Sequence, residues 1–325
     1  MFIMVWNCQG AASKSFRRAL KQFIRVYNPS IVCLLEPKVS GDHANRICNS
    51  LGFRDWIRVE AYGFSGGIWV FWKDVIKVEI ITTHPQFISM QVIDNLSEPW
   101  LFTVVYGSPN QYLRRNLFAD LSGQDMDVLL PWLIAGDFNS VTCQEEVNNQ
   151  DNFSISRSSD FNDWIFREGL VDLGFAGSKF TWMRGSSSST FKGARRDRAL
   201  ANTTWKLKFP SALVEHLPIV ESDHSPLLIN MCPSTSVRRQ KPFRFIMAWG
   251  THPNFQDVVR QSWDKDIHLA LNLRNVAEAL TRWNKNVFGN IFYRKKKILA
   301  RLSGVQRSLT FQIRSDLLKL EKKLR

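Results

Sequence analysis

Five short apolar runs, each followed within a few positions by a polar side chain, constrain the fold of this chain most strongly. Runs of four or five apolar residues bounded by Gly, Pro, Asn or Asp are typical of strands buried on both faces. A strand fixes its own backbone while the residue after it reaches free space, so strand ends are where scaffolds place reactive side chains. We therefore expect the residues after these runs to converge in one site. The runs are Phe2–Trp6, Ile31–Leu35, Leu101–Val105, Trp132–Ala135 and Leu217–Val220, and the polar residues that follow are Asn7, Glu36, Tyr106, Asp137 with Asn139, and Asp223 with His224.

Helical periodicity fills some of the intervals between the runs. Apolar residues recur at helical spacing within Lys14–Tyr27, where Pro29 ends the pattern, and Ser159–Leu170 gives a second helix. Buried strands that alternate with a few helices predict a mixed α/β or α+β domain over residues 1–230.

Charge divides the chain into two parts. Residues 1–230 hold 23 basic and 23 acidic side chains, whereas residues 231–325 hold 20 basic and 6 acidic ones. The net charge of +14 therefore lies entirely in the second part. A basic segment of this size favours a polyanionic partner such as nucleic acid, and a neutral domain rich in acids suits a metal site.

The basic tail also differs in its periodicity. A polar stretch, Ser234–Lys241, predicts a linker over 231–242. An a/d seam then runs from Leu269 to Val287, and a second apolar stripe runs from Ile298 to Leu324. Two long basic helices in a hairpin are the simplest interpretation of 243–325. Since the second stripe has no stop signal, we expect a connector truncated within a longer protein.

Cysteine usage and hydropathy bear on the compartment. Five scattered Cys residues without C-x-x-C spacing argue against a disulfide framework and against a structural zinc site. The apolar N-terminus is too short for a signal-peptide core, and no apolar run approaches the length of a bilayer span. We therefore expect a soluble, intracellular protein with no membrane partner.

Two carboxylates, Glu36 and Asp137, follow buried strands, where an unpaired charge would be very costly. A donor set of Glu, Asp, Asn and a hydroxyl suits magnesium better than zinc. For either carboxylate taken alone, a cap on the following helix or turn is the alternative. In the segment Gly136–Asn139, the Gly permits a tight exit, and the Asp and Asn bring a base and an amide donor to one side.

His224 is the one histidine of six that lies in a polar cluster, Ser222–Ser225. An Asp–His partnership supports an imidazolium, which can serve an acid/base step or bind developing negative charge. A loop histidine with satisfied hydrogen bonds is the alternative. Asp197 by itself indicates a charge-balanced surface turn, but the basic residues around it predict a local phosphate-facing patch. These are Lys192, Arg195, Arg196, Arg198, Lys206 and Lys208.

Seven short segments, taken in order, resemble the motifs of the endonuclease/exonuclease/phosphatase superfamily. In particular they resemble the apurinic-type endonuclease domain of plant LINE (non-LTR) retrotransposon polyproteins. This resemblance covers about residues 1–230 and implies a four-layered α/β/β/α sandwich of the deoxyribonuclease type, with a C-terminal helical extension. The segments are Trp6–Gly10, Leu35–Lys38, Val105–Pro109, Gly136–Asn139, Phe180–Trp182, Arg196–Leu200 and Ser222–Ser225.

The same resemblance implies a role for each site residue. A divalent cation, Mg²⁺ with Mn²⁺ as an alternative, would be held by Glu36, assisted by Asn7 and Asp223. Asp137, oriented by Asn139, would activate the attacking water. His224, held by Asp197, would contact the scissile phosphate. Tyr106 would hydrogen-bond a phosphate oxygen or the leaving group. Thr181 would contact the DNA strand, beside the patch that contains Arg195, Arg196 and Arg198.

One position departs from the apurinic repair enzymes. They carry an acid two positions after the first Asn, whereas Gln9 stands here. This favours the retrotransposon branch, which nicks intact DNA. The tail resembles the segment that precedes the reverse transcriptase in plant LINE polyproteins, and this chain contains no Asp-Asp pair that could form a polymerase site.

These patterns lead to one main expectation and two alternatives. We expect a Mg²⁺-dependent, monomeric DNA endonuclease of a LINE-type element, nuclear after assembly in the cytoplasm, whose basic tail binds nucleic acid such as the element RNA. One alternative is a truncated or domesticated remnant that binds nucleic acid without catalysis. The other is an apurinic repair nuclease or a phosphatase of the same superfamily.

Overall fold

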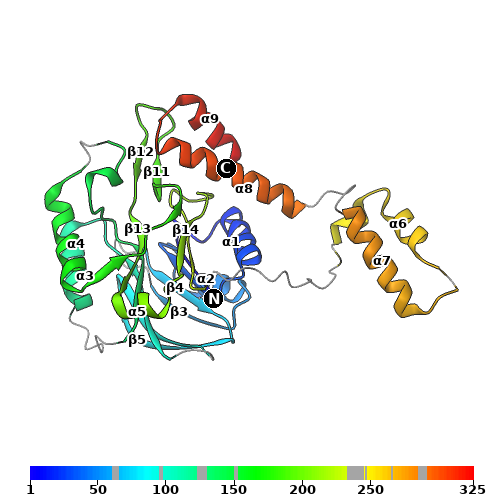
Figure 1. Cartoon of the computed structure of the whole chain (residues 1–325), viewed down its shortest axis with the longest axis horizontal. Coiled ribbons are helices and arrows are strands. Elements are labelled where there is room, and N and C mark those ends of the chain that lie inside the picture. Colours follow the sequence, from blue (N-terminus) through cyan, green and yellow to red (C-terminus); the bar gives the residue numbers. More distant parts are fainter. Residues whose placement is uncertain are drawn as a thin grey trace. The chain divides into compact units, whose positions relative to one another are not determined.

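The computed structural model describes residues 1–60, 66–94, 98–122, 130–149, 153–232, 245, 247–264, 266–284 and 291–325. The chain forms two compact units: the first joins Met1–Ser234 to Leu302–Arg325, and the second is Thr235–Arg301 (Figure 1). The predicted connector 243–325 is thus shared between the two units. The predicted linker 231–242 lies mostly outside the described residues, and the boundary near residue 230 stays a prediction.

The first unit contains two large sheets, of which one has seven strands in the order β10-β14-β15-β1-β2-β4-β3. β1 lies inside this sheet, parallel to β2 and antiparallel to β15, and its last residue Asn7 pairs with Leu35. The strands are β1 (Phe2–Asn7), β2 (Ile31–Leu35), β3 (Asp55–Val59), β4 (Ile68–Trp72), β10 (Ala176–Gly177), β14 (Leu213–His216) and β15 (Leu227–Asn230).

The other sheet has six strands in the order β5-β6-β7-β8-β13-β9. β7 runs parallel to β8 and pairs Tyr106 with Asp137, and β13 runs antiparallel to β8 and pairs Asp197 with Asp137. The strands are β5 (Ile76–His84), β6 (Phe87–Asp94), β7 (Trp100–Tyr106), β8 (Trp132–Asp137), β9 (Leu170–Asp172) and β13 (Asp197–Asn202). A separate ribbon pairs β11 (Trp182–Arg184) with β12 (Lys192–Ala194).

One apolar core lies between the sheets, because alternate residues of each strand point to the same side. Val5 and Ile229 of the first sheet share a buried cluster with Phe102 and Ala135 of the second. The intervening residues of the same strands point to the other face of each sheet, toward the outer helices. The strands are therefore buried on both faces, as their apolar runs predict.

Helices cover the outer faces of both sheets (Figure 1). α1 (Lys14–Tyr27) packs on the first sheet, where the ring of Phe16 lies 4.7 Å from that of Trp6. α3 (Gln111–Ser122) and α4 (Ile155–Arg167) pack on the second sheet in a cluster that includes Phe138. The four-layered sandwich predicted by the resemblance is confirmed. Two shorter helices, α2 (Gly41–Asn49) and α5 (Thr203–Lys208), and the 3-10 helix η1 (Gln144–Glu146) also belong to this unit.

The fifth apolar run, Leu217–Val220, is not a strand, so this expectation is wrong. β14 ends before it, at His216, and β15 begins after it, at Leu227. Pro218 has no N–H to donate to a ladder, and both backbone groups of Ile219 bond to a side chain instead. The run is buried, but it forms a loop between two strands.

The second apolar stripe of the tail forms two helices instead of one, namely α8 (Ile291–Leu309) and α9 (Ser315–Leu324). The chain turns between them over residues 310–314. From Leu302 onward these helices belong to the first unit. They pack there in an apolar cluster with Phe180, Met183 and Ile219.

The second unit has its own small core. η3 (Met247–Thr251), α6 (Phe255–Ser262) and α7 (Leu269–Trp283) meet where the rings of Trp249 and Trp283 lie 6.3 Å apart. The predicted seam to Val287 ends four residues earlier as α7, and residues 285–290 lie outside the described part. In the described residues, no helix is both long and apolar enough for a membrane span.

Candidate functional site

Strand ends from both sheets meet at one edge of the sandwich. Asn7 ends β1 and Asp137 ends β8, and the Nδ2 group of Asn7 donates to Oδ2 of Asp137 at 2.9 Å. The same Nδ2 group donates to Oε1 of Glu36 at 3.2 Å. Asn7 therefore links two carboxylates that come from different sheets. Its role as a metal ligand stays a prediction.

Asp137 is fully buried and held by Asn139. The backbone N–H of Asn139 donates to Asp137 Oδ1 at 2.8 Å, and the Asn139 amide donates to Asp137 Oδ2 at 3.3 Å. Gly136 lets the end of β8 lie close to β7, because a Cβ at this position would lie 1.9 Å from the Val105 carbonyl oxygen of β7. The geometry matches the orienting contact expected for Asn139, and the catalytic role of Asp137 stays a prediction.

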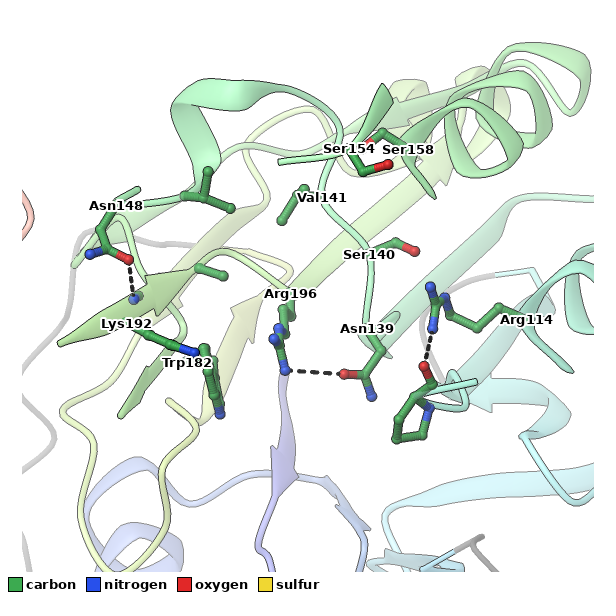
Figure 2. Close-up of a pocket in the computed structure, with 14 residues that line it drawn as sticks. Arg114, Asn139, Ser140, Val141, Asn148, Ser154, Ser158, Trp182, Lys192 and Arg196 are labelled. Atoms are coloured by element: carbon green, nitrogen blue, oxygen red, sulfur yellow. Dashed lines mark hydrogen bonds between the residues drawn. The ribbon is translucent and has the colours of Figure 1, made fainter. Parts of the chain in front are cut away.

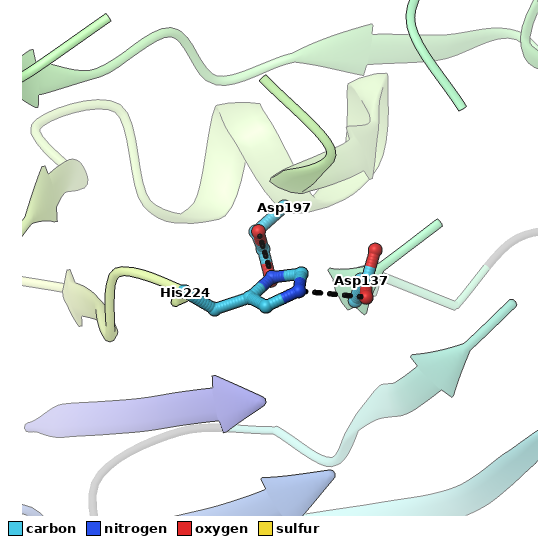
Figure 3. Close-up of side chains that lie close together, drawn as sticks. All are labelled: Asp137, Asp197 and His224. Carbon is cyan, nitrogen blue, oxygen red and sulfur yellow. Dashed lines mark hydrogen bonds and ion pairs between the residues drawn. The ribbon is translucent and has the colours of Figure 1, made fainter. Parts of the chain in front are cut away.

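His224 lies between two carboxylates (Figure 3). Its Nδ1 is 2.9 Å from Asp197 Oδ2, and its Nε2 is 3.8 Å from Asp137 Oδ2. Burial opposes a charge on this ring, but the Asp197 and Asp137 carboxylates outweigh it and raise the pKa of His224 to about 9. Burial and the nearby Asp197 charge raise the pKa of Asp137 to about 6. The ring therefore carries a proton at neutral pH, in a site from which water is largely excluded.

The carboxylate of Glu36 is a further acidic group of the site, separate from the cluster of Asp137, Asp197 and His224. The φ angle of Glu36 is +50°, a value that residues other than Gly rarely adopt. With this backbone conformation, its carboxylate lies against Asn7 in the site. Lys38 Nζ lies 2.9 Å from Glu36 Oε2, and Gln9 Nε2 donates to Oε1 at 3.2 Å. Burial, together with the Glu36 carboxylate, raises the pKa of Tyr106, so this phenol stays protonated and can donate a hydrogen bond.

Two groups of side chains could hold a divalent cation. Among the described residues, ligand atoms of Asp137, Asp197 and His224 all lie within 4.8 Å of one another. Each ring nitrogen of His224 faces a carboxylate, so this group also suits proton and charge chemistry.

Glu36 fits a cation better. The Lys38 ammonium already lies against its carboxylate, where it stands in for a cation. Asp223 Oδ2 accepts from Trp182 Nε1 at 3.0 Å, while the buried Oδ1 has no hydrogen-bond partner among the described residues. A carboxylate oxygen of this kind is a hard donor of the type that Mg²⁺ or Mn²⁺ prefers.

Three residues predicted to touch DNA are buried, so these predictions are wrong. Thr181 is 0 % exposed, and its Oγ1 accepts from the N–H groups of Arg196 and Asp197, both at 2.9 Å. It fixes the backbone that carries Asp197. Arg195 and Arg198 are 7 % and 0 % exposed and bind carboxylates in the interior.

Arg195 and Arg198 form a cyclic ion-pair quartet with Glu146 of η1 and Asp172 of β9. Each guanidinium contacts both carboxylates at distances between 2.7 and 3.0 Å. Burial opposes ionisation, but the guanidinium groups keep the pKa of Glu146 and of Asp172 below the usual range. The quartet therefore anchors the residues on either side of Arg196 and Asp197.

Arg196 alone of the three predicted arginines lines a cavity of about 320 Å³ (Figure 2). Its guanidinium stacks 3.9 Å above the Trp182 ring and donates to Asn139 Oδ1 at 3.3 Å. Lys192 and Arg114 also line this cavity, which gives it a cationic wall. Arg114, on α3, was not predicted, because nothing in the local sequence around it indicates a site.

The comparisons with known proteins agree with this fold. Residues 4–224 match the model of the Endonuclease/Exonuclease/phosphatase family. An AP endonuclease from Archaeoglobus fulgidus has a TM-score of 0.55 and 14% identity, over 71% of this chain and 98% of that one. The AP endonuclease LMAP from Leishmania major has a TM-score of 0.54 and 13% identity, over 70% and 86%. The endonuclease domain of TRAS1, a telomere-specific non-LTR retrotransposon, has a TM-score of 0.50 and 14% identity, over 74% and 99%. At these identities the structures show a shared fold; a comparison with curated proteins gave no match.

Proposed function

Because the chain belongs to the endonuclease/exonuclease/phosphatase family, whose members are hydrolases, we propose that it is a metal-dependent DNA endonuclease. The observation that carries this proposal is the buried His224 ring, which lies between the Asp197 and Asp137 carboxylates. Hydrolysis of a phosphodiester needs a positioned base, a charge for the developing phosphorane and a stabilised leaving oxygen. In this proposal Asp137, His224 and Tyr106 take these three roles.

In the proposed reaction, Asp137 orients the attacking water and accepts its proton, while Asn139 and Asn7 hold the carboxylate in place. His224, kept protonated by Asp197, donates to a phosphate oxygen as negative charge develops. Tyr106 donates to a second oxygen or to the leaving group. Glu36 and Asp223, with Asn7, would hold Mg²⁺ or Mn²⁺, which when bound supplies positive charge at the phosphate.

The cationic wall of the cavity supports a nucleic-acid substrate. We expect Arg196→Ala to raise the KM for DNA roughly tenfold, because a charge-assisted phosphate contact is lost. The slope of log affinity against log salt should fall by about one. Arg184→Ala is the matched control, since Arg184 is exposed on the neighbouring ribbon strand β11. Fluorescence anisotropy over a salt series measures the slope of log affinity against log salt for each variant. Equal changes of this slope in Arg196→Ala and Arg184→Ala would contradict a specific role for Arg196.

We further propose that the protein acts in the nucleus as the nicking domain of a LINE-type element, as a monomer. Gln9 supports this branch over abasic-site repair, because its neutral amide lies against Glu36 where an acid would add a ligand. The basic tail, residues 243–325, would bind nucleic acid, with the element RNA as one candidate. A catalytically silent remnant is less well supported, since the buried charge cluster of the site is fully formed.

The direct test is a nicking assay. The protein should convert supercoiled plasmid to the open circle with Mg²⁺ or Mn²⁺, and EDTA should stop the reaction. An abasic oligonucleotide and a small phosphate monoester serve as competing substrates. Cleavage of the abasic DNA alone would favour the repair alternative, and a plasmid that stays closed with either metal would exclude the proposed function.

A further inference from the structure

The segment Leu302–Arg325, here called the C-terminal clamp, packs on the unit that carries the site. Val305, Leu309 and Leu318 of the clamp share a buried cluster with Phe180 and Ile219. In Figure 1 the clamp, drawn in orange-red to red as the end of α8 and as α9, lies beside β11 and β12. These contacts place a segment of the basic tail within the fold of the candidate enzyme.

Gln306 is the polar centre of the clamp and is 1 % exposed. Its Oε1 accepts from the N–H of Ile219 at 3.0 Å, and its Nε2 donates to the carbonyl of Ile219 at 3.2 Å. A primary amide that binds both backbone groups of one residue replaces the partner strand that this run lacks. Buried backbone groups left without partners are costly, so this loop conformation depends on Gln306.

A second contact reaches the same loop further along. Gln306 Nε2 also donates to Glu321 Oε1 at 3.1 Å, and Glu321 pairs with Arg325. Arg325 Nη1 in turn donates to the carbonyl of Ser222 at 3.4 Å. The clamp therefore holds the loop at Ile219 and at Ser222.

Ser222 connects the loop to the site. Its Oγ donates to the carbonyl of Asn7 at 2.8 Å and accepts from the N–H of His224 at 3.1 Å. A shift of the Ile219–Ser222 loop would displace Ser222 and, with it, the backbone of His224. Hydrolytic sites are sensitive to such shifts, because a misplacement of about 1 Å can cost roughly a hundredfold in rate.

We propose that the C-terminal clamp is part of the catalytic unit and that Gln306 is a positioning residue, which fixes His224 through the Ile219–Ser222 loop. The rate effect rests on the proposed function, whereas the effect on the loop does not. The clamp thus differs from the second unit, Thr235–Arg301, which makes no part of this hydrogen-bond chain in the described residues.

The test uses the full chain with Gln306→Ala and, as a matched control, Gln312→Ala, because Gln312 is exposed on the turn between α8 and α9. Hydrogen exchange measures the amides of Ile219 and His224 well below the unfolding temperature. We expect the protection of both amides to fall about tenfold or more in Gln306→Ala and to stay unchanged in Gln312→Ala. In the nicking assay, kcat should fall roughly tenfold to a hundredfold at constant KM.

A second pair of variants distinguishes a local effect on the loop from a general loss of stability. Gln306→Glu keeps the acceptor for Ile219 but repels Glu321, and Glu321→Gln in the same chain restores a donor between the two side chains. The double variant should recover part of the protection and of the kcat that Gln306→Glu loses. Unchanged protection in Gln306→Ala would overturn the inference, and so would lost protection at Ile219 with normal His224 protection and normal kcat. A wild type that does not nick but shows the predicted exchange pattern would refute the proposed function alone.

Discussion

Asp137→Asn should reduce kcat for plasmid nicking by about 10²–10⁴-fold, the range that a positioned general base contributes. The substitution keeps the volume of the side chain and its acceptor for the Asn139 N–H, which Asp137 receives at 2.8 Å. It removes the basic oxygen and also one of the three carboxylate charges, those of Asp197, Asp137 and Asp223, that raise the pKa of His224. Binding of DNA should be nearly unchanged, because Asp137 is fully buried.

The matched control for this substitution is Asp74→Asn. The Asp74 side chain is 61% exposed and pairs with Arg54 on the surface, so its neutralisation should leave kcat within twofold. Single-turnover nicking with excess enzyme separates kcat from binding. Retention of most of the wild-type rate in Asp137→Asn would remove Asp137 from the role of base.

Glu146→Ala should lower the free energy of unfolding by about 3–5 kcal/mol, because it leaves two buried guanidinium groups with one carboxylate between them. Arg198 is 0 % exposed and cannot reach water without a rearrangement of β13. Since β13 also begins with Asp197, partial unfolding at this point should weaken the hold on His224.

Urea denaturation followed by circular dichroism measures this loss. Glu79→Ala is the control: Glu79 pairs with Lys77 on β5, but the two side chains are 48% and 68% exposed, so the expected loss is less than about 1 kcal/mol. If the two substitutions lower the free energy of unfolding equally, the quartet stabilises the fold no more than an ordinary surface ion pair does.

The sequence predicted the site through features that are local. A buried strand and the residue after it are neighbours in the chain, so Asn7, Glu36 and Asp137 could be recognised one by one. Family resemblance supplied the partnership of Asp197 with His224, which lie 27 positions apart. The four-layered architecture followed from the same order of motifs.

The errors concern contacts that no local pattern contains. Arg195 and Arg198 were assigned to DNA because they belong to a cluster of six basic residues around one acid, Asp197. Their partners Glu146 and Asp172 lie 49 and 26 positions away and are not marked by any motif. Likewise Ile219 is an apolar residue typical of a strand, and the partner of its backbone in the loop, Gln306, lies 87 positions later in the chain.

The side chain of Asn7 also bears on how the protein becomes active during folding. It bonds to residues 29 and 130 positions away, and the Trp6 indole donates to the carbonyl of His224 across 218 positions. Contacts of such long range form slowly and late, after the entropy of closing large loops has been overcome. A nascent or partly unfolded chain therefore lacks the complete cluster of catalytic groups. Under the proposed function, cleavage of nucleic acid begins only when the whole sandwich has closed.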